Sequence, residues 1–341
     1  MSVSPRSSVP SFLDSVTTSP WWRRGFYVVL LLALFLVPVY MANNYVIRIL
    51  VLVCLFGAAA TGWNLLGGYA NQISLGHTVF FGIGAYAVVI FQGTYGLSPW
   101  LAIPVGVVGS VIVAVLIGWP TFQLSGHYFA LATLALLPVF AIIATYWKDL
   151  TGGPLGISVP ILESGLDTLQ FDTPVPFFYI AAILMVLVMI LARWVRYSRF
   201  GLQLDAIRLN PDAATLAGVN MFRAKMKALI LSAIVVSVVG SFYGAFLQFI
   251  EPGVAFAWTV TINVVLFSFV GGVRFWWGPA LGAFILIPLS EYAKLQLTGN
   301  SAELGQLAYG VILILIVLFQ PRGIGGMFTT IWRKAVNRKQ A

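Results

Sequence analysis

The sequence has few charged residues and a single cysteine. Only 9% of its 341 residues are charged and 60% are hydrophobic, whereas a soluble globular domain averages about 25% charged and about 45–50% apolar residues. So few charges cannot cover a water-exposed surface, which excludes an ordinary soluble enzyme, and so many apolar residues exclude a disordered chain. Because Cys54 stands alone, an internal disulfide and a multi-cysteine metal site are excluded too.

The sequence also lacks the common motifs for ATP binding, for zinc binding and for a catalytic serine. The chain has no Gly-x-x-x-x-Gly-Lys-Ser/Thr segment for ATP phosphates, no His-Glu-x-x-His zinc motif and no Gly-x-Ser-x-Gly nucleophile elbow. All ten acidic residues fall in or near predicted loops, whereas proton-coupled transporters place carboxylates at membrane depth. We therefore expect no enzyme activity and no cofactor or metal in this chain, and an energy source in another protein.

Ten apolar stretches predict an all-α polytopic membrane protein with about ten transmembrane helices. The first stretch, 25–42, follows a pair of arginines and is interpreted as a span, with a secretory signal peptide as the alternative. A span needs about 20 apolar residues, so a transmembrane domain is expected over 25–320, and Pro138 predicts a kink. The other nine stretches are 49–66, 76–92, 100–117, 127–147, 176–194, 227–249, 257–272, 278–290 and 304–320.

The charge distribution predicts the orientation of these spans. With ten crossings and both termini cytoplasmic, the inner segments carry 16 basic and three acidic residues, and the outer segments carry three basic and seven acidic residues. This is the positive-inside bias of a bacterial plasma (inner) membrane protein, so the net charge of +9 indicates topology and not nucleic-acid binding. We expect a disordered cytoplasmic tail at 1–24, a basic cytoplasmic tail at 321–341, an external loop at about 149–175 and a cytoplasmic loop at about 195–226.

Residues 64–84 form an uncharged polar segment between two apolar stretches. Eleven of these 21 residues are glycine or polar, and none carries a formal charge. We interpret the segment as non-helical or half-helical backbone at partial membrane depth, which is tolerated only where protein or a water-filled cavity satisfies its polar groups. It either lines a substrate path or is a polar turn with helix-packing glycines. The candidate path residues are Asn64, Asn71, Gln72, Ser74 and His77.

A second segment, residues 193–227, combines seven basic residues with interleaved apolar ones. It divides at Asn210-Pro211 into two predicted short helices, because proline suits the first position of a helix and Gly218 can end the second helix. The interleaved apolar residues favour docking of a soluble partner. The alternative is a basic loop held to anionic lipid.

Four segments resemble the M-type permease subunits of branched-chain amino acid ABC importers. They are residues 64–86, 125–135 with 151–157, 198–220, and 270–283 with 318–327. The resemblance implies a permease subunit in the membrane lipid that works with a second permease subunit, with two ATP-binding cassette subunits that use ATP, and with an extracytoplasmic solute-binding protein.

The resemblance identifies 198–220 as the cytoplasmic coupling loop, in which the implied coupling positions are Gly201, Asp205, Ala206, Arg208, Asn210, Ala214 and Gly218. The chain departs from the family pattern near 203–209, which carries fewer charges, and at Glu251. These departures leave the solute open between branched-chain amino acids and other small solutes such as urea or short amides. A self-contained channel or facilitator, which would pass solute without ATP, is the alternative of another class.

Overall fold

The structure is a computed structural model that describes residues 43–124 and 126–296 and the single residues 310, 324 and 326. The predicted span 25–42 and the tail 1–24 lie outside the described residues, and so do the span 304–320 and the tail 321–341 apart from those single residues. The elements are α3 (Asn44–Gly67), α4 (His77–Gly93), α5 (Pro99–Thr121), α6 (His127–Leu134), α7 (Leu136–Tyr146), α8 (Lys148–Thr151), the 3-10 helix η1 (Gly153–Leu155), β1 (Ile157–Ser158), α9 (Pro174–Tyr197), α10 (Arg199–Leu209), α11 (Pro211–Leu216), α12 (Met221–Leu247), β2 (Phe249–Ile250), α13 (Pro252–Ala255), α14 (Trp258–Gly271) and α15 (Gly278–Gln296).

The chain is an all-α polytopic membrane protein. Over the described residues, six helical segments are long and apolar enough to cross a membrane: α3, α5, α6 with α7, α9, α12, and α13 with α14. Each of the eight apolar stretches predicted between residues 49 and 290 coincides with a helix. The helix α12 begins at Met221, six residues before the predicted start, because the Asn220 side chain accepts a hydrogen bond from the Arg223 amide and caps it.

The predicted kink at Pro138 is confirmed. The segment that was expected as one helix divides into α6, which ends at Leu134, and α7, which begins at Leu136. Proline has no amide hydrogen, and its ring collides with the carbonyl group four residues earlier, here that of Leu134. The break therefore lies one turn before the proline itself.

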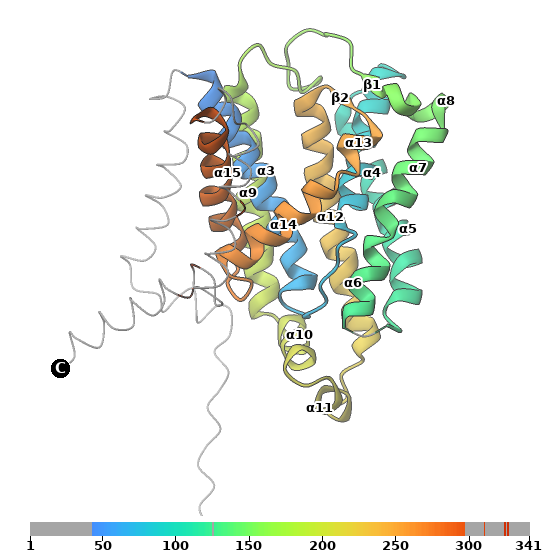
Figure 1. Ribbon diagram of the computed structural model, residues 1–341, viewed down its shortest axis with the longest axis vertical. Helices are drawn as coiled ribbons and strands as arrows, with labels where there is room; N and C mark the ends of the chain where they lie inside the picture. Colours follow the sequence, from blue (N-terminus) through green and yellow to red (C-terminus); the bar gives the residue numbers. More distant parts are fainter. Residues whose placement is uncertain (1–42, 125, 297–309, 311–323, 325, 327–341) are drawn as a thin grey trace, which may run out of the picture.

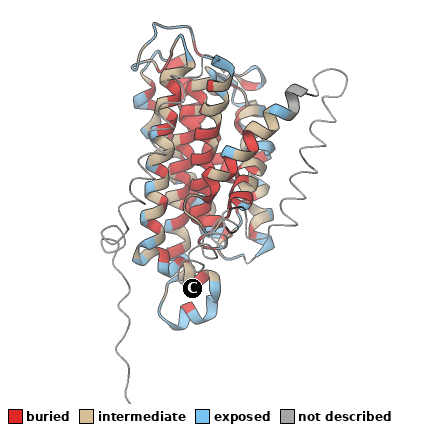
Figure 2. Ribbon diagram, turned by 90° about the vertical axis from the view of Figure 1, so that its left-hand side faces the viewer, coloured by how far each residue is buried: buried red, intermediate tan, exposed pale blue. Residues whose placement is uncertain are grey.

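The core of the bundle lies between α3, α4 and α12. Within the most apolar 18-residue stretch of each helix, 67% is buried in α3 and in α12, compared with 28% in α5 and 33% in α9. Figure 2 shows this contrast, with buried residues along the central helices and exposed residues on the outer faces. The exposed residues of α5 recur at helical spacing and form a stripe suited to lipid; they include Leu101, Val105, Val108, Ile112 and Leu116.

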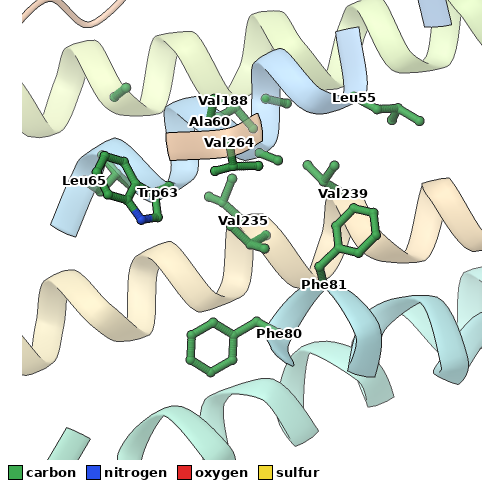
Figure 3. Packing of buried hydrophobic residues seen from close by; sticks show 14 of the residues in the cluster. Leu55, Ala60, Trp63, Leu65, Phe80, Phe81, Val188, Val235, Val239 and Val264 are labelled. Atoms are coloured by element: carbon green, nitrogen blue, oxygen red, sulfur yellow. The ribbon is translucent and has the colours of Figure 1, made fainter. Parts of the chain in front are cut away.

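Side chains from five helices meet in this core (Figure 3). Four of the labelled residues come from α3 (Leu55, Ala60, Trp63 and Leu65) and two from α4 (Phe80 and Phe81), and the other labelled ones come from α9, α12 and α14. Most of these residues are fully buried, so the helices are held by dense packing. The residues labelled in the figure from the other three helices are Val188, Val235, Val239 and Val264.

Glycines let α12 approach α4 almost to backbone contact, as the four-residue spacing of Gly240 and Gly244 predicts. A Cβ atom at Gly240 would collide with the Phe81 carbonyl oxygen and would lie 2.8 Å from Phe81 Cα. One at Gly244 would lie 2.8 Å from the Ala85 carbonyl oxygen. The Ser241 hydroxyl donates to the Gly84 carbonyl oxygen across the same seam, at 3.1 Å. These small residues therefore serve internal packing.

The end of the bundle opposite α10 and α11 carries a short two-stranded sheet (Figure 1). The strands β1 and β2 are antiparallel, with Ile157 opposite Ile250. The predicted external loop at about 149–175 contains tight turns, since Gly152, Gly153 and Gly156 all have positive φ. The loop that follows is anchored by three donors, because Gln92 Nε2, Ser98 Oγ and Trp100 Nε1 donate to the successive carbonyl groups of Thr168, Asp167 and Leu166.

Replacement of Gly240 by alanine should destabilise the bundle. The added methyl group has no room against the α4 backbone, and overpacking of this kind costs about 1–3 kcal/mol. We expect a lower free energy of unfolding and a lower melting temperature in detergent.

Gly109→Ala is the matched control, because a Cβ atom there would meet Ile83 Cγ2 at an ordinary 3.4 Å. This variant should be at least as stable as the parent chain, since alanine is favoured over glycine inside a helix. Equal melting temperatures for the two variants would contradict the close approach of α4 and α12.

Candidate functional sites

The first candidate site is the connection between α3 and α4. Residues 68–76 are not helical, and Asn71 has a left-handed φ of 54°. Non-helical backbone is therefore confirmed for the middle of the predicted segment 64–84, whose ends, 64–67 and 77–84, belong to α3 and α4. The connection leads into the interior, because His77, the first residue of α4, contacts Ser232 of α12. Ser232 lies 11 residues into its helix, which is about 16 Å along the helix axis at 1.5 Å per residue. The start of α4 therefore lies deep in the bundle.

Three other segments satisfy the polar backbone of this connection. The Leu75 amide donates to Thr133 Oγ1 of α6 at 3.0 Å. Trp63 Nε1 of α3 donates to the Ser74 carbonyl oxygen at 2.7 Å, and Thr261 Oγ1 of α14 donates to the Leu75 carbonyl oxygen at 3.2 Å. Because these donors and acceptors come from α3, α6 and α14, the break is a built part of the fold.

His77 is buried and lies at the centre of a hydrogen-bonded chain. Its Nε2 atom lies 2.8 Å from Ser232 Oγ, and Ser232 Oγ donates its only hydrogen to the Gly62 carbonyl oxygen at 2.7 Å. The hydroxyl must therefore accept from His77, which places the imidazole hydrogen on Nε2. The Nδ1 atom is left as an acceptor without a partner among the described residues. This geometry fits an uncharged, fixed imidazole.

A second hydrogen-bonded pair lies beside this chain. Thr78 Oγ1 bonds to Thr261 Oγ1, so the first turn of α4 is joined to α14. Two small cavities flank the start of α4. One is lined by residues that include Ser74, Thr121 and Thr133, and the other by residues that include His77, Thr78 and Thr261. Each has room for about one water molecule.

The five predicted path residues lie in three different places in the structure. Ser74 and His77 are buried together at the start of α4, whereas Asn71 is exposed and Gln72 is half-buried nearer the start of the connection. Asn64 is fully buried in the last turn of α3, and both polar atoms of its side chain have no partner within the described part of the chain. The sequence did not indicate Thr78, Thr133, Ser232 or Thr261, because single hydroxyl residues in apolar helices carry no spacing signal.

The second candidate site is the pair of helices α10 and α11, which confirms the predicted division at Asn210-Pro211. The Ser198 hydroxyl caps α10 by accepting from the Gly201 amide at 3.2 Å. The Asn210 side chain caps α11 by accepting from the Ala213 amide at 3.0 Å, and the chain leaves the pair at Gly218, where φ is 83°. Serine and asparagine are among the preferred N-cap residues, so this local structure follows from the sequence.

The pair has a buried side and an exposed side. Leu204, Ile207 and Ala214 pack inward with at most 3% of their surface exposed. On the other side Leu209 is 75% exposed and Leu216 is 90% exposed, and Figure 1 shows α10 and α11 at the end of the bundle. The interleaved apolar residues from which docking was predicted include these leucines, and Leu202, Leu209 and Leu216 recur at a seven-residue spacing.

The predicted coupling positions fall on both sides of the pair. Gly201 and Ala214 are buried, so they serve the packing of the pair. Asp205, Ala206 and Arg208 are half-buried, and Asn210 and Gly218 are exposed. Asp205 forms ion pairs with Arg196 of α9 at 2.6 Å and with Arg208 at 3.2 Å.

Comparison with known proteins supports one family. Residues 45–317 match the family described as "Branched-chain amino acid transport system / permease component". The chain is similar to the high-affinity branched-chain amino acid transport system permease protein LivM of Escherichia coli (strain K12), with 26% identity over 93% of this chain and 78% of the relative. No solved structure gave a significant match.

Two relatives named LivH are also similar to the chain. A probable branched-chain amino acid transport permease protein LivH of Methanocaldococcus jannaschii is 27% identical over 74% of this chain and 81% of its own length. The LivH permease protein of Escherichia coli (strain K12) is 23% identical over 80% of this chain and 91% of its own length.

Replacement of Ser232 by alanine should destabilise the start of α4. The His77 Nε2 hydrogen would lose its acceptor in a buried site, and an unsatisfied buried donor costs about 1–3 kcal/mol. We expect the free energy of unfolding in detergent to fall by that amount.

Ser237→Ala in the same helix is the matched control. The Ser237 hydroxyl is buried and has no hydrogen-bond partner in the described structure, so its removal should leave stability unchanged or raise it. Equal losses for Ser232→Ala and Ser237→Ala would show that the His77 hydrogen bond is not what stabilises this region.

Proposed function

The chain belongs to the family of permease components of branched-chain amino acid transport systems, and from this premise we propose that it is the transmembrane subunit of an ATP-driven importer for branched-chain amino acids or a similar small polar solute. The observation that carries the proposal is the protruding pair α10–α11 with its exposed leucines. The relatives reported above are named for branched-chain amino acids, which does not favour a urea or short-amide importer.

The proposed topology has ten crossings with both termini cytoplasmic, in the bacterial plasma (inner) membrane. The charges at the two ends of the described bundle support this orientation. The end with α10 and α11 is basic and carries Arg193, Arg196, Arg199, Arg208, Arg223, Lys225, Lys227 and Arg274. The end with the short sheet is acidic and carries Asp149, Glu163, Asp167, Asp172 and Glu251.

In this arrangement α10 and α11 bind an ATP-binding cassette subunit on the cytoplasmic side. The exposed Leu209 and Leu216 form an apolar surface that suits a soluble protein partner. The exposed Arg199, Arg223 and Lys227 at the same end suit anionic lipid headgroups or an acidic surface of that partner. Two such subunits use the ATP, and their closure moves the coupling positions Asp205, Ala206, Arg208 and Asn210. Gly201 and Ala214 hold the pair in place.

The solute path in the proposal passes the start of α4. The groups there are hydroxyl, imidazole and backbone amide groups without formal charge, which suits a zwitterionic or neutral solute. The cavities beside Ser74 and His77 have room for about one water molecule each, so import requires a change of conformation. A second permease subunit completes the path, and a solute-binding protein docks at the external loop.

Leu216→Asp should break the contact with the ATP-binding cassette subunit. A carboxylate buried in an interface without a partner costs about 2 kcal/mol or more, which is more than tenfold in affinity. Gentle detergent purification of the tagged chain from its native membrane should recover two ATPase subunits and a second permease, and the variant should recover far less ATPase.

Leu166→Asp provides the matched control, since Leu166 is a similarly exposed leucine (63%) in the external loop. It should retain the ATPase subunits. A chain that purifies alone and passes solute into liposomes without ATP would instead indicate a self-contained facilitator.

Two changes within α10 should uncouple transport from ATP hydrolysis. Arg208→Gln removes one ion pair of Asp205, and Ala206→Pro breaks α10 because proline cannot occupy a helix interior without a loss of about 3 kcal/mol. Both changes lie outside the spans, so membrane insertion should be unaffected. We expect ATP hydrolysis to continue while solute uptake falls severalfold; normal uptake by both variants would refute the coupling role of α10.

A further inference from the structure

The last turn of α9 joins the pair α10–α11 to the connection between α3 and α4. The Arg196 guanidinium donates to Asp205 of α10, with 2.6 Å between Nη1 and Oδ2. The same guanidinium lies over the Tyr69 ring, 5.5 Å from its centroid. One side chain therefore contacts both candidate sites.

Tyr69 lies at the start of the α3–α4 connection and is 1% exposed. Its amide donates to the Asn64 carbonyl oxygen at 3.0 Å, which joins the start of the connection to the last turn of α3. Its hydroxyl approaches the Ala192 carbonyl oxygen of α9 at 3.5 Å. Ala192 and Arg196 are one helical turn apart, so the ring lies along the last turn of α9.

The junction between α9 and α10 holds α10 close to α9. Ser198 Oγ donates to the Val195 carbonyl oxygen at 2.8 Å and accepts from the Gly201 amide. A Cβ atom at Gly201 would collide with the Val195 carbonyl oxygen and lie 2.7 Å from that of Arg196. A displacement of α10 is therefore passed to the last turn of α9.

We propose that Arg196 is a positioning residue that transmits movement of α10 to the α3–α4 connection through Tyr69. This inference rests on the proposed importer function. The guanidinium suits the role because it is planar: its edge donates to a carboxylate while its face lies over an aromatic ring. From Tyr69 the chain runs five residues to Ser74 and eight to His77, so the contact reaches the polar start of α4.

The test uses the transporter assembled with its ATPase subunits and binding protein in liposomes. The first measurement is the number of solute molecules imported per ATP hydrolysed. The second is amide hydrogen exchange at residues 69–73, which reports the opening of the connection independently of transport and is also measured on the chain alone in detergent.

Arg196→Gln and Tyr69→Leu should each lower the import ratio severalfold and increase exchange at 69–73. Tyr69→Phe keeps the ring and should behave like the parent chain. Arg196→Lys keeps the charge for Asp205 but not the planar face, so its import ratio should lie between those of the parent and Arg196→Gln. Arg223→Gln is the charge control, because Arg223 is exposed at the same end of the bundle, and it should change neither measurement.

Unchanged ratio and exchange in Arg196→Gln would overturn the proposal. So would a parallel fall of uptake and hydrolysis at a constant ratio, because that result indicates a purely structural role. If the parent chain shows no ATP-dependent uptake, the importer function itself is wrong. The exchange measurement then still decides whether Arg196 holds the connection through Tyr69.

Discussion

The structure depends on the requirement that every backbone polar group inside a bilayer be satisfied by the protein. Helices meet this requirement within themselves, which is why the described residues are so largely helical. The connection between α3 and α4 is the informative exception. Its backbone is satisfied by Trp63, Thr133 and Thr261 from three different segments, and so the polar start of α4 can lie deep in the bundle.

The same constraint explains how the helices are held together. Lipid tails are as apolar as leucine side chains, so burial of apolar surface does little to drive helix association in a membrane. Close packing and hydrogen bonds between helices take its place. Gly240 and Gly244 bring α12 against α4, and Ser232 and Ser241 add hydrogen bonds across the helices. The apolar residues exposed on α5 then suit the lipid environment.

Local sequence patterns predicted the elements of this fold well. Apolar runs predicted the eight described helical stretches, Pro138 predicted the kink, and Asn210-Pro211 predicted the division into α10 and α11. Each of these features depends on residues that lie only a few positions apart. The partner of His77 could not be predicted in this way, since Ser232 lies 155 residues along the chain. The contact of Arg196 with Tyr69 is equally remote in sequence, and the two-residue strands β1 and β2 are too short to leave a periodic pattern.

In the proposed importer, the uncharged groups around the described start of α4 and the protruding helix pair have one explanation, which is that a separate subunit supplies the energy. A transporter that draws energy from an ion gradient needs titratable or ion-binding groups near its solute path, whereas one driven by a separate ATPase needs a mechanical contact with it. The described groups at the start of α4 are neutral, and the ion pairs of Asp205 lie instead at the end that bears α10. Because packed interiors deform little, a shift of α10 in the proposed importer would reach the proposed path through contacts such as that between Arg196 and Tyr69.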